Sequence, residues 1–111
     1  MNFFDLFKAP DINNGIAEMR KKQNAVLLDV RTEAEYNEVH IPGSINIPLN
    51  RLQTVAAIKL PKKEIPFYVH CFSGSRSRQA IRLLKHLGYT DVIDIGGIHN
   101  YHGKTERGAA I

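Results

Sequence analysis

Residues 67–77 read FYVHCFSGSRS, and this stretch decides the fold. Phe67–Val69 is apolar and β-prone, which predicts a buried strand that leads into His70 and Cys71. Small residues follow, and then Arg76. Further on, apolar residues recur at the spacing of one helix face, at Ala80, Leu83, Leu84 and Leu87. The segment therefore predicts a strand, a tight loop and a helix, and residues 71–77 are called the cysteine loop below.

The rest of the chain alternates short β-prone runs with helical stretches in the same way. Further strands are expected at Ala25–Val30, Ser44–Ile47 and Val92–Ile95. Further helices are expected at Asn13–Lys22, from Thr32 to about Val39, and from Leu49 to about Ile58. This alternation is typical of an α/β fold with a central, mainly parallel sheet of about five short strands and helices on both faces. We expect a single domain over residues 1–111, in which residues 1–24 form an N-terminal segment and the first helix.

Local signals mark several of these boundaries. Thr32 and Glu35 have the spacing of a capping box, in which each side chain bonds the backbone of the other. Pro42 and Gly43 predict a turn before the second strand, and Gly88 predicts the end of the helix after the cysteine loop. The first helix is the least well defined, because Gly15 weakens it.

Composition excludes several classes of protein. The chain has 111 residues and a single cysteine, so an internal disulfide scaffold is impossible. Fifteen Lys and Arg against eleven Asp and Glu give a formal net charge of +4. Part of that excess is clustered between residues 76 and 85 without interleaved aromatic residues, so we expect no nucleic-acid partner. No apolar run approaches the roughly 20 residues that span a bilayer, so we expect no membrane partner. Because the first residues lack the pattern of a secretory signal and the chain cannot form an internal disulfide, we expect a cytoplasmic protein.

The cysteine loop has the features of an anion-binding nucleophile site. Cys71 lies at the carboxyl end of a strand, where open α/β sheets bind ligands. A loop of small residues directs successive N–H groups inward, and the helix that follows adds its positive end, so the thiolate is favoured. Arg76 adds a fixed cation that can hold an oxyanion through two N–H groups. We therefore expect Cys71 to be catalytic and the substrate-binding residues to be Phe72, Ser73, Gly74, Ser75, Arg76 and Ser77.

Residues 71–77 resemble the active-site loop of rhodanese domains, which are thiosulfate or persulfide sulfurtransferases. Two further groups of segments resemble the family in the same order, residues 28–31, 35–36 and 40–48 upstream, and residues 84–89 and 96–97 downstream. The resemblance covers residues 25–103. Val39 stands where the family often has Gly, and Tyr101 where many members have Trp.

The resemblance implies a sulfurtransferase that carries sulfur as a persulfide on Cys71. The donor is expected to be thiosulfate or a persulfide, and the acceptor an external thiol, a protein cysteine or, in an assay, cyanide. No cofactor and no metal are expected, and the chain is expected to be a monomer or a weak dimer. A non-catalytic anion- or partner-binding regulatory module is the alternative. A Cys-dependent phosphatase or arsenate reductase is less favoured, because the phosphatase loop has one more residue than the four between Cys71 and Arg76.

Other polar residues lie near the same sheet edge. Asp29 and Arg31 are possible supporting residues, and Asp29 is expected to be a structural partner of Arg31 or of backbone amides. Glu35 is accounted for by the capping box, and His70 is expected to point to the side of its strand opposite Cys71. His99 and His102 follow Gly96-Gly97, and the sequence assigns them no role.

Overall fold

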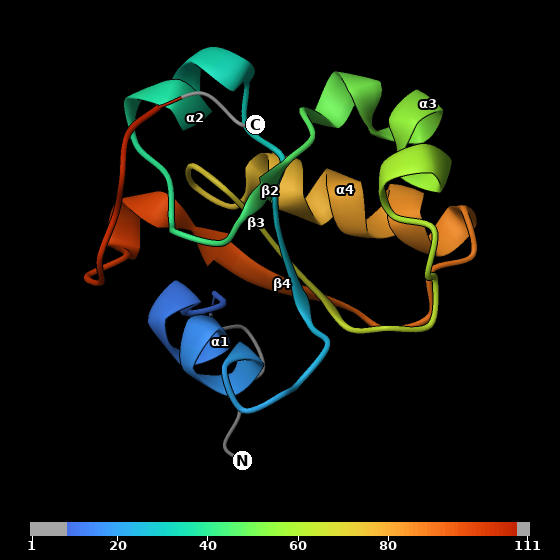
Figure 1. The fold of residues 1–111 in the computed structure, drawn as a ribbon, viewed down its shortest axis with the longest axis horizontal. Helices are drawn as coiled ribbons and strands as arrows, with labels where there is room; N and C mark the ends of the chain where they lie inside the picture. The colour runs from blue at the N-terminus through green and yellow to red at the C-terminus, as the bar shows by residue number, and fades with distance from the viewer. Residues whose placement is uncertain (1–8, 109–111) are drawn as a thin grey trace.

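The structure is a computed structural model that describes residues 9–108. Four strands run over β1 Val26–Asp29, β2 Ile45–Asn46, β3 Phe67–Cys71 and β4 Val92–Gly97. The helices are α1 Ile12–Met19, α2 Glu33–Glu38, α3 Leu49–Lys59 and α4 Ser75–His86, with a short 3₁₀ turn, η2, at Ile98–Asn100 (Figure 1). The predicted α/β fold is confirmed.

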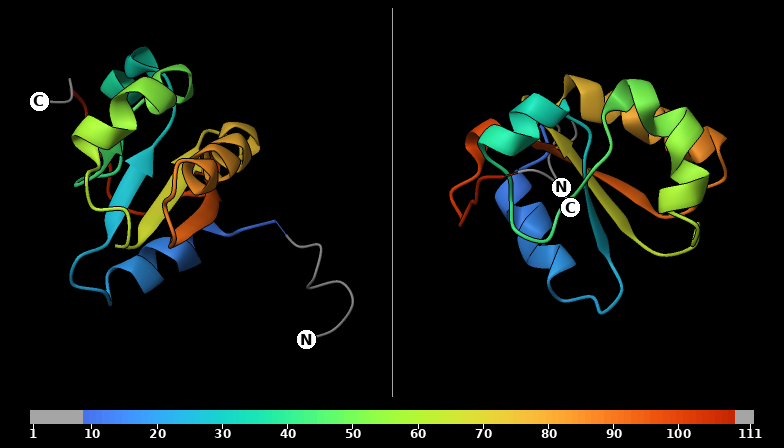
Figure 2. Two further views of the ribbon diagram at one scale, coloured as in Figure 1. Left: turned by 90° about the vertical axis from the view of Figure 1, so that its right-hand side faces the viewer. Right: turned by 45° about the horizontal axis from the view of Figure 1, so that its top comes forward.

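The strands form one parallel sheet in the order β2-β1-β3-β4. Helix α1 covers one face, and α3 and α4 cover the other (Figure 2). The sheet has four strands in the described residues rather than about five. Strands β3 and β4 also extend two residues beyond their predicted ends, because His70 pairs with Gly96 and Cys71 with Gly97.

The sheet separates two apolar clusters, because side chains alternate between its faces. Val30, Val69 and Cys71 belong to the cluster under α3 and α4, with Leu52 and Leu84 from those helices. On the other face, Ile12 and Ile16 of α1 pack with a second cluster that includes Leu27, Tyr68 and Ile95. Cys71 therefore lies on the α4 side of the sheet.

The helix boundaries follow the capping signals. Thr32 and Glu35 form the predicted capping box at the start of α2, and Gly88 follows α4 with φ at 98°. Helix α1 ends at Met19, earlier than predicted. Gly15 is required there by close packing, since a Cβ atom would collide with the side chain of Ile95. The glycine that weakens the helix in isolation lets it approach β4.

The C-terminal segment runs back along α2. His40 and Glu106 form an isolated antiparallel bridge, and the N–H of Gly108 donates to the carbonyl of Asn37. The His40 ring stacks on Tyr36 with their centroids 3.9 Å apart. Among residues 9–108, no helix is long and apolar enough to cross a membrane.

Candidate active site

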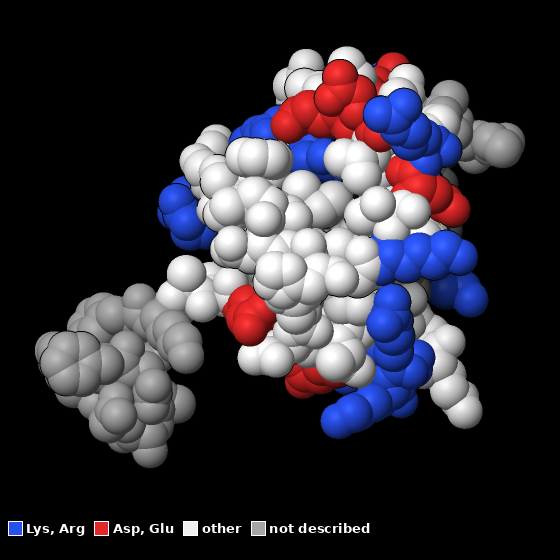
Figure 3. Space-filling view, turned by 90° about the vertical axis from the view of Figure 1, so that its left-hand side faces the viewer, with Lys and Arg blue, Asp and Glu red and all other residues white. Residues whose placement is uncertain are grey.

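The cysteine loop lies at the point where the strand order of the sheet reverses. From β1 the chain first reaches its neighbour β2, and later β3 and β4 on the other side. Cys71 is the last residue of β3, beside the end of β1, and such a switch point is where open α/β sheets bind ligands. Figure 3 looks at the side of the molecule that carries the β3–α4 loop, and the centre of this side is uncharged with charged side chains around it.

The thiol of Cys71 is buried at the base of the loop. Its residue is only 1% exposed, and the N–H of Gly74 donates to Sγ at 2.9 Å. Ser77 Oγ lies 3.6 Å from Sγ and donates to the carbonyl of Gly74 at 3.0 Å. Helix α4 begins at the next residue, Ser75, with no side-chain cap on its first N–H groups. Sulfur, backbone amide and helix N-terminus therefore converge as the sequence predicts.

Arg76 has a partner that the sequence pattern does not indicate. Its two terminal nitrogens donate to the two carboxylate oxygens of Glu35, at 2.6 and 2.9 Å. This pair lowers the pKa of Glu35 to about 2 and raises that of Arg76. Each terminal nitrogen uses one of its N–H groups for Glu35, and the binding of an oxyanion by Arg76 stays a prediction.

Asp29 and Arg31 form the pair that the sequence predicts, away from the thiol. Arg31 Nη2 donates to Asp29 Oδ2 at 2.7 Å, and both side chains are fully buried. Arg31 also donates to the carbonyl of Val39, so it connects the end of β1 to the turn after α2. Because Asp29 pairs in register with His70, it lies on the sheet face opposite Cys71. These two residues support the sheet edge rather than contact the sulfur.

His70 is buried behind the cysteine, as predicted. Its Nδ1 lies 3.2 Å from the carbonyl oxygen of Cys71, and its Nε2 lies 3.7 Å from Asp29 Oδ2. Burial lowers the pKa of His70, and the negative charge of Asp29 offsets only part of this shift. The imidazole is therefore neutral at ordinary pH and contributes packing rather than charge.

The outer side of the loop contacts β4 and η2. The Phe72 ring is 49% exposed and lies near the ring of His99, with centroids 5.4 Å apart. His99 Nδ1 donates to the carbonyl oxygen of Phe72 at 2.7 Å. The backbone of Gly97 packs against the same carbonyl so closely that a Cβ atom would collide with it. His102 takes no part in this contact, and its N–H donates to Asn13.

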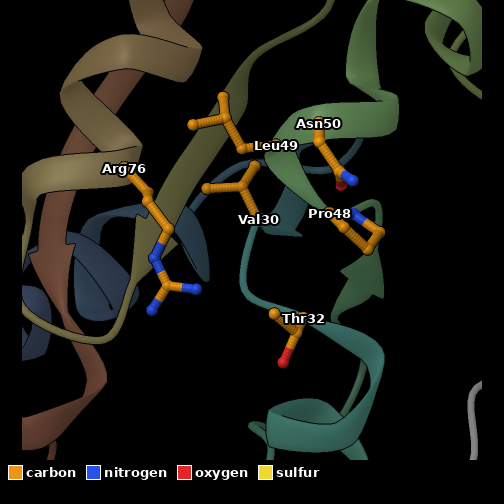
Figure 4. Close-up of a pocket in the computed structure, with 6 residues that line it drawn as sticks. All are labelled: Val30, Thr32, Pro48, Leu49, Asn50 and Arg76. Carbon is orange, nitrogen blue, oxygen red and sulfur yellow. The ribbon is translucent and has the colours of Figure 1, made fainter.

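An apolar hollow of about 320 Å³ lies next to the loop. Figure 4 shows Arg76 on one side, Pro48 and Asn50 on the other, and Val30 and Leu49 between them. Val30, which directly follows β1, and Cys71, the last residue of β3, belong to the same apolar cluster. Arg76 is the residue that the hollow shares with the cysteine loop. Within residues 9–108, no group of His, Cys, Asp or Glu side chains is placed to hold a metal ion.

The fold and the site together are those of an α/β protein with a buried cysteine between a parallel strand and the start of a helix. Residues 14–104 match the rhodanese-like domain family. The chain belongs to the rhodanese-like domain family.

Similar proteins include thiosulfate sulfurtransferase PspE of Escherichia coli, which is 38% identical over 71 residues, covering 64% of this chain and 68% of that protein. The putative sulfur carrier protein YrkF of Bacillus subtilis is 41% identical over 72% of this chain and 43% of its own length. The adenylyltransferase and sulfurtransferase uba4 of Ogataea parapolymorpha is 39% identical, but the chain spans only 21% of it. Among solved structures, a rhodanese with anions from E. coli superposes with a TM-score of 0.71 at 33% identity, covering 77% of this chain and all of that one.

Proposed function

We propose that this chain is a sulfurtransferase that takes a sulfane sulfur from thiosulfate or a persulfide and carries it on Cys71. The observation that carries the proposal is the 2.9 Å contact between the Gly74 N–H and Sγ, in a loop that ends at the start of α4. An N–H donor and a helix N-terminus stabilise negative charge on sulfur. The likeness to PspE, a thiosulfate sulfurtransferase, supports the same activity.

The loading step transfers one sulfur atom to the enzyme. The Cys71 thiolate attacks the outer sulfur of thiosulfate, a new sulfur–sulfur bond forms, and the old one breaks. Its electron pair leaves with sulfite, so the charge is conserved and the enzyme holds a persulfide anion. A persulfide donor releases a thiolate in place of sulfite.

The discharge step needs an external acceptor. Because Cys71 is the only cysteine of the chain, no second thiol of this chain can form a disulfide with it. Cyanide or an acceptor thiolate attacks the outer sulfur, and Cys71 leaves as thiolate. The product is thiocyanate or a new persulfide, and an acceptor that arrives as a thiol releases its proton to solvent. Two separate steps on one sulfur give ping-pong kinetics.

The proposed roles of the loop residues follow their positions. The N–H of Gly74, which already donates to Sγ, and the other N–H groups of the loop are proposed to stabilise the transferred charge. With its terminal nitrogens on Glu35, Arg76 acts as a positive charge beside the site and links the loop to α2. The apolar hollow beside Val30 leaves space for the carbon chain of a small thiol acceptor.

The direct test is intact-mass measurement after incubation with thiosulfate. The wild-type chain is expected to gain one sulfur atom and to lose it when cyanide is added, with release of thiocyanate. The Cys71→Ser variant is the matched control and is expected to gain none. Equal gain by this variant would refute the assignment of Cys71.

The same preparation separates the alternatives. A regulatory module whose thiol reacts with alkylating agents but gives no thiocyanate would refute sulfur transfer. Hydrolysis of an aryl phosphate that is lost in Cys71→Ser would indicate a phosphatase instead. The cytoplasmic location and the monomeric or weakly dimeric state stay predictions.

A further inference from the structure

His99 holds the Phe72–Ser73 peptide of the cysteine loop in one orientation. The carbonyl oxygen of Phe72 accepts two hydrogen bonds from this residue, from Nδ1 at 2.7 Å and from the backbone N–H at 3.2 Å. A carbonyl oxygen only accepts, so Nδ1 carries the proton. The imidazole therefore donates this bond from Nδ1.

The packing of β4 leaves this peptide little freedom to rotate. A Cβ atom on Gly97 would lie 2.6 Å from His99 Nδ1 and 2.7 Å from Ser73 Cα. Real side-chain carbons do not approach so closely, so loop and strand are in direct backbone contact. The Phe72 carbonyl is therefore fixed against the end of β4.

The orientation of a carbonyl fixes the N–H on the other side of its peptide bond. The described residues contain no cis peptide, and in a trans peptide C=O and N–H point in opposite directions. With the Phe72 oxygen directed at His99, the N–H of Ser73 points away from η2. The next amide along the chain, that of Gly74, already donates to Sγ.

We propose that His99 is a positioning residue for sulfur transfer, which turns the Ser73 N–H toward the sulfur bound on Cys71. In this inference, which rests on the proposed function, His99 does not touch the reacting atoms. It acts through the Phe72 carbonyl and fixes the orientation of the Ser73 N–H, which would be a second donor to the sulfur beside the N–H of Gly74. Donors fixed in advance stabilise developing charge without reorganisation at the moment of reaction.

Three substitutions of His99 test the inference, because they differ in where they place a hydrogen-bond donor for the Phe72 carbonyl. In His99→Asn the side-chain nitrogen occupies nearly the place of Nδ1, whereas in His99→Gln it lies one methylene further out. His99→Ala removes the donor altogether. The measurement is the rate of persulfide formation from thiosulfate, by quenched intact-mass spectrometry, with the thermal midpoint of each variant alongside. His86→Ala, an exposed histidine at the far end of α4, is the matched control.

Loading by His99→Ala and His99→Gln is expected to slow about tenfold. Removal of one fixed donor costs on the order of a hundredfold, and the backbone N–H of residue 99 still holds the carbonyl in every variant. His99→Asn is expected to stay within about twofold of wild type, as is His86→Ala. The rescue by Asn separates positioning from a general loss of packing, which would lower the thermal midpoint without depending on where the donor lies.

Two results would overturn the inference while the proposed function stands. They are loading by His99→Ala at the wild-type rate, whatever its thermal midpoint, and loading by His99→Asn as slow as that of His99→Ala. If the wild-type chain itself gains no sulfur from either thiosulfate or a persulfide donor, the proposed function fails, and the inference fails with it.

Discussion

The ion pair between Glu35 and Arg76 allows a quantitative prediction from one substitution, Glu35→Gln. The variant removes the charge but keeps a side-chain oxygen that can accept from the N–H of Thr32, as Glu35 does at 3.0 Å. The hydrogen bond of the capping box to the backbone is therefore retained. The loss in stability then measures the interaction with Arg76.

The magnitude follows from the pKa of Glu35, which Arg76 chiefly, together with the hydrogen bonds from Thr32, lowers from 4.5 to about 2. A change of this size corresponds to about 3 kcal/mol in favour of the carboxylate. Both side chains are 32% exposed, so water screens the pair, and we expect a loss of about 1–1.5 kcal/mol at pH 7. Because the pKa is lowered on folding, this contribution is complete above pH 4.5 and disappears as the pH falls toward 2.

Urea unfolding at several pH values provides the assay, with Glu33→Gln as the control. Glu33 lies in the same turn of α2, but its pair with Arg51 is 59% and 67% exposed. We expect the control to lose about 0.3 kcal/mol or less. The reasoning is refuted if Glu35→Gln costs no more than Glu33→Gln at pH 7, or if its cost is unchanged at pH 2.5.

Three further perturbations have defined outcomes. Gly97→Ala places a Cβ atom against the Phe72 carbonyl, so we expect a loss of about 2 kcal/mol in a thermal melt and slower sulfur loading; wild-type values for both would contradict the close contact. Ser77→Ala removes the hydroxyl that donates to the Gly74 carbonyl, and unfolding in urea is expected to show a loss of about 1–2 kcal/mol. Burial lowers the pKa of His70, so wild-type stability should fall as the pH drops below about 6.5, because the unfolded state binds the proton first. In His70→Gln this slope between pH 6.5 and 5.5 should be smaller, and an unchanged slope would assign it to another group.

The parts of the fold that the sequence predicts are those set by local chemistry. The capping box of Thr32 and Glu35 is a contact between residues three apart, and the apolar face of α4 is a periodicity within one helix. The position of Cys71 at the end of a strand is predicted from the small residues that follow it. The predicted end of α1 was three residues too late. The reason why Gly15 is needed there was also missing, because the packing of Gly15 on Ile95 is a tertiary contact that no local pattern contains.

The same distinction between local and long-range contacts applies to the residues around the thiol. The contact between Arg76 and Glu35 joins residues 41 positions apart, and that between His99 and Phe72 joins residues 27 apart. The capping box already accounted for the carboxylate of Glu35, so nothing in the sequence called for a second partner. In the structure, Oε1 accepts from both Thr32 and Arg76, and one side chain serves the start of α2 and the cysteine loop together.

The depth of the thiol has a consequence for the order in which reactants can reach the sulfur. Cys71 is 1% exposed, so in the proposed cycle a donor must extend a narrow end into the loop before any bond forms. Once loaded, the reactive atom stands one sulfur–sulfur bond, about 2 Å, further from the strand. The shape of the donor is therefore more restricted, at the step in which it enters the loop, than the shape of the acceptor, which meets a sulfur that lies further out. A bulky partner that is excluded from the empty enzyme can still collect sulfur from the loaded enzyme, provided that its own thiol projects from its surface.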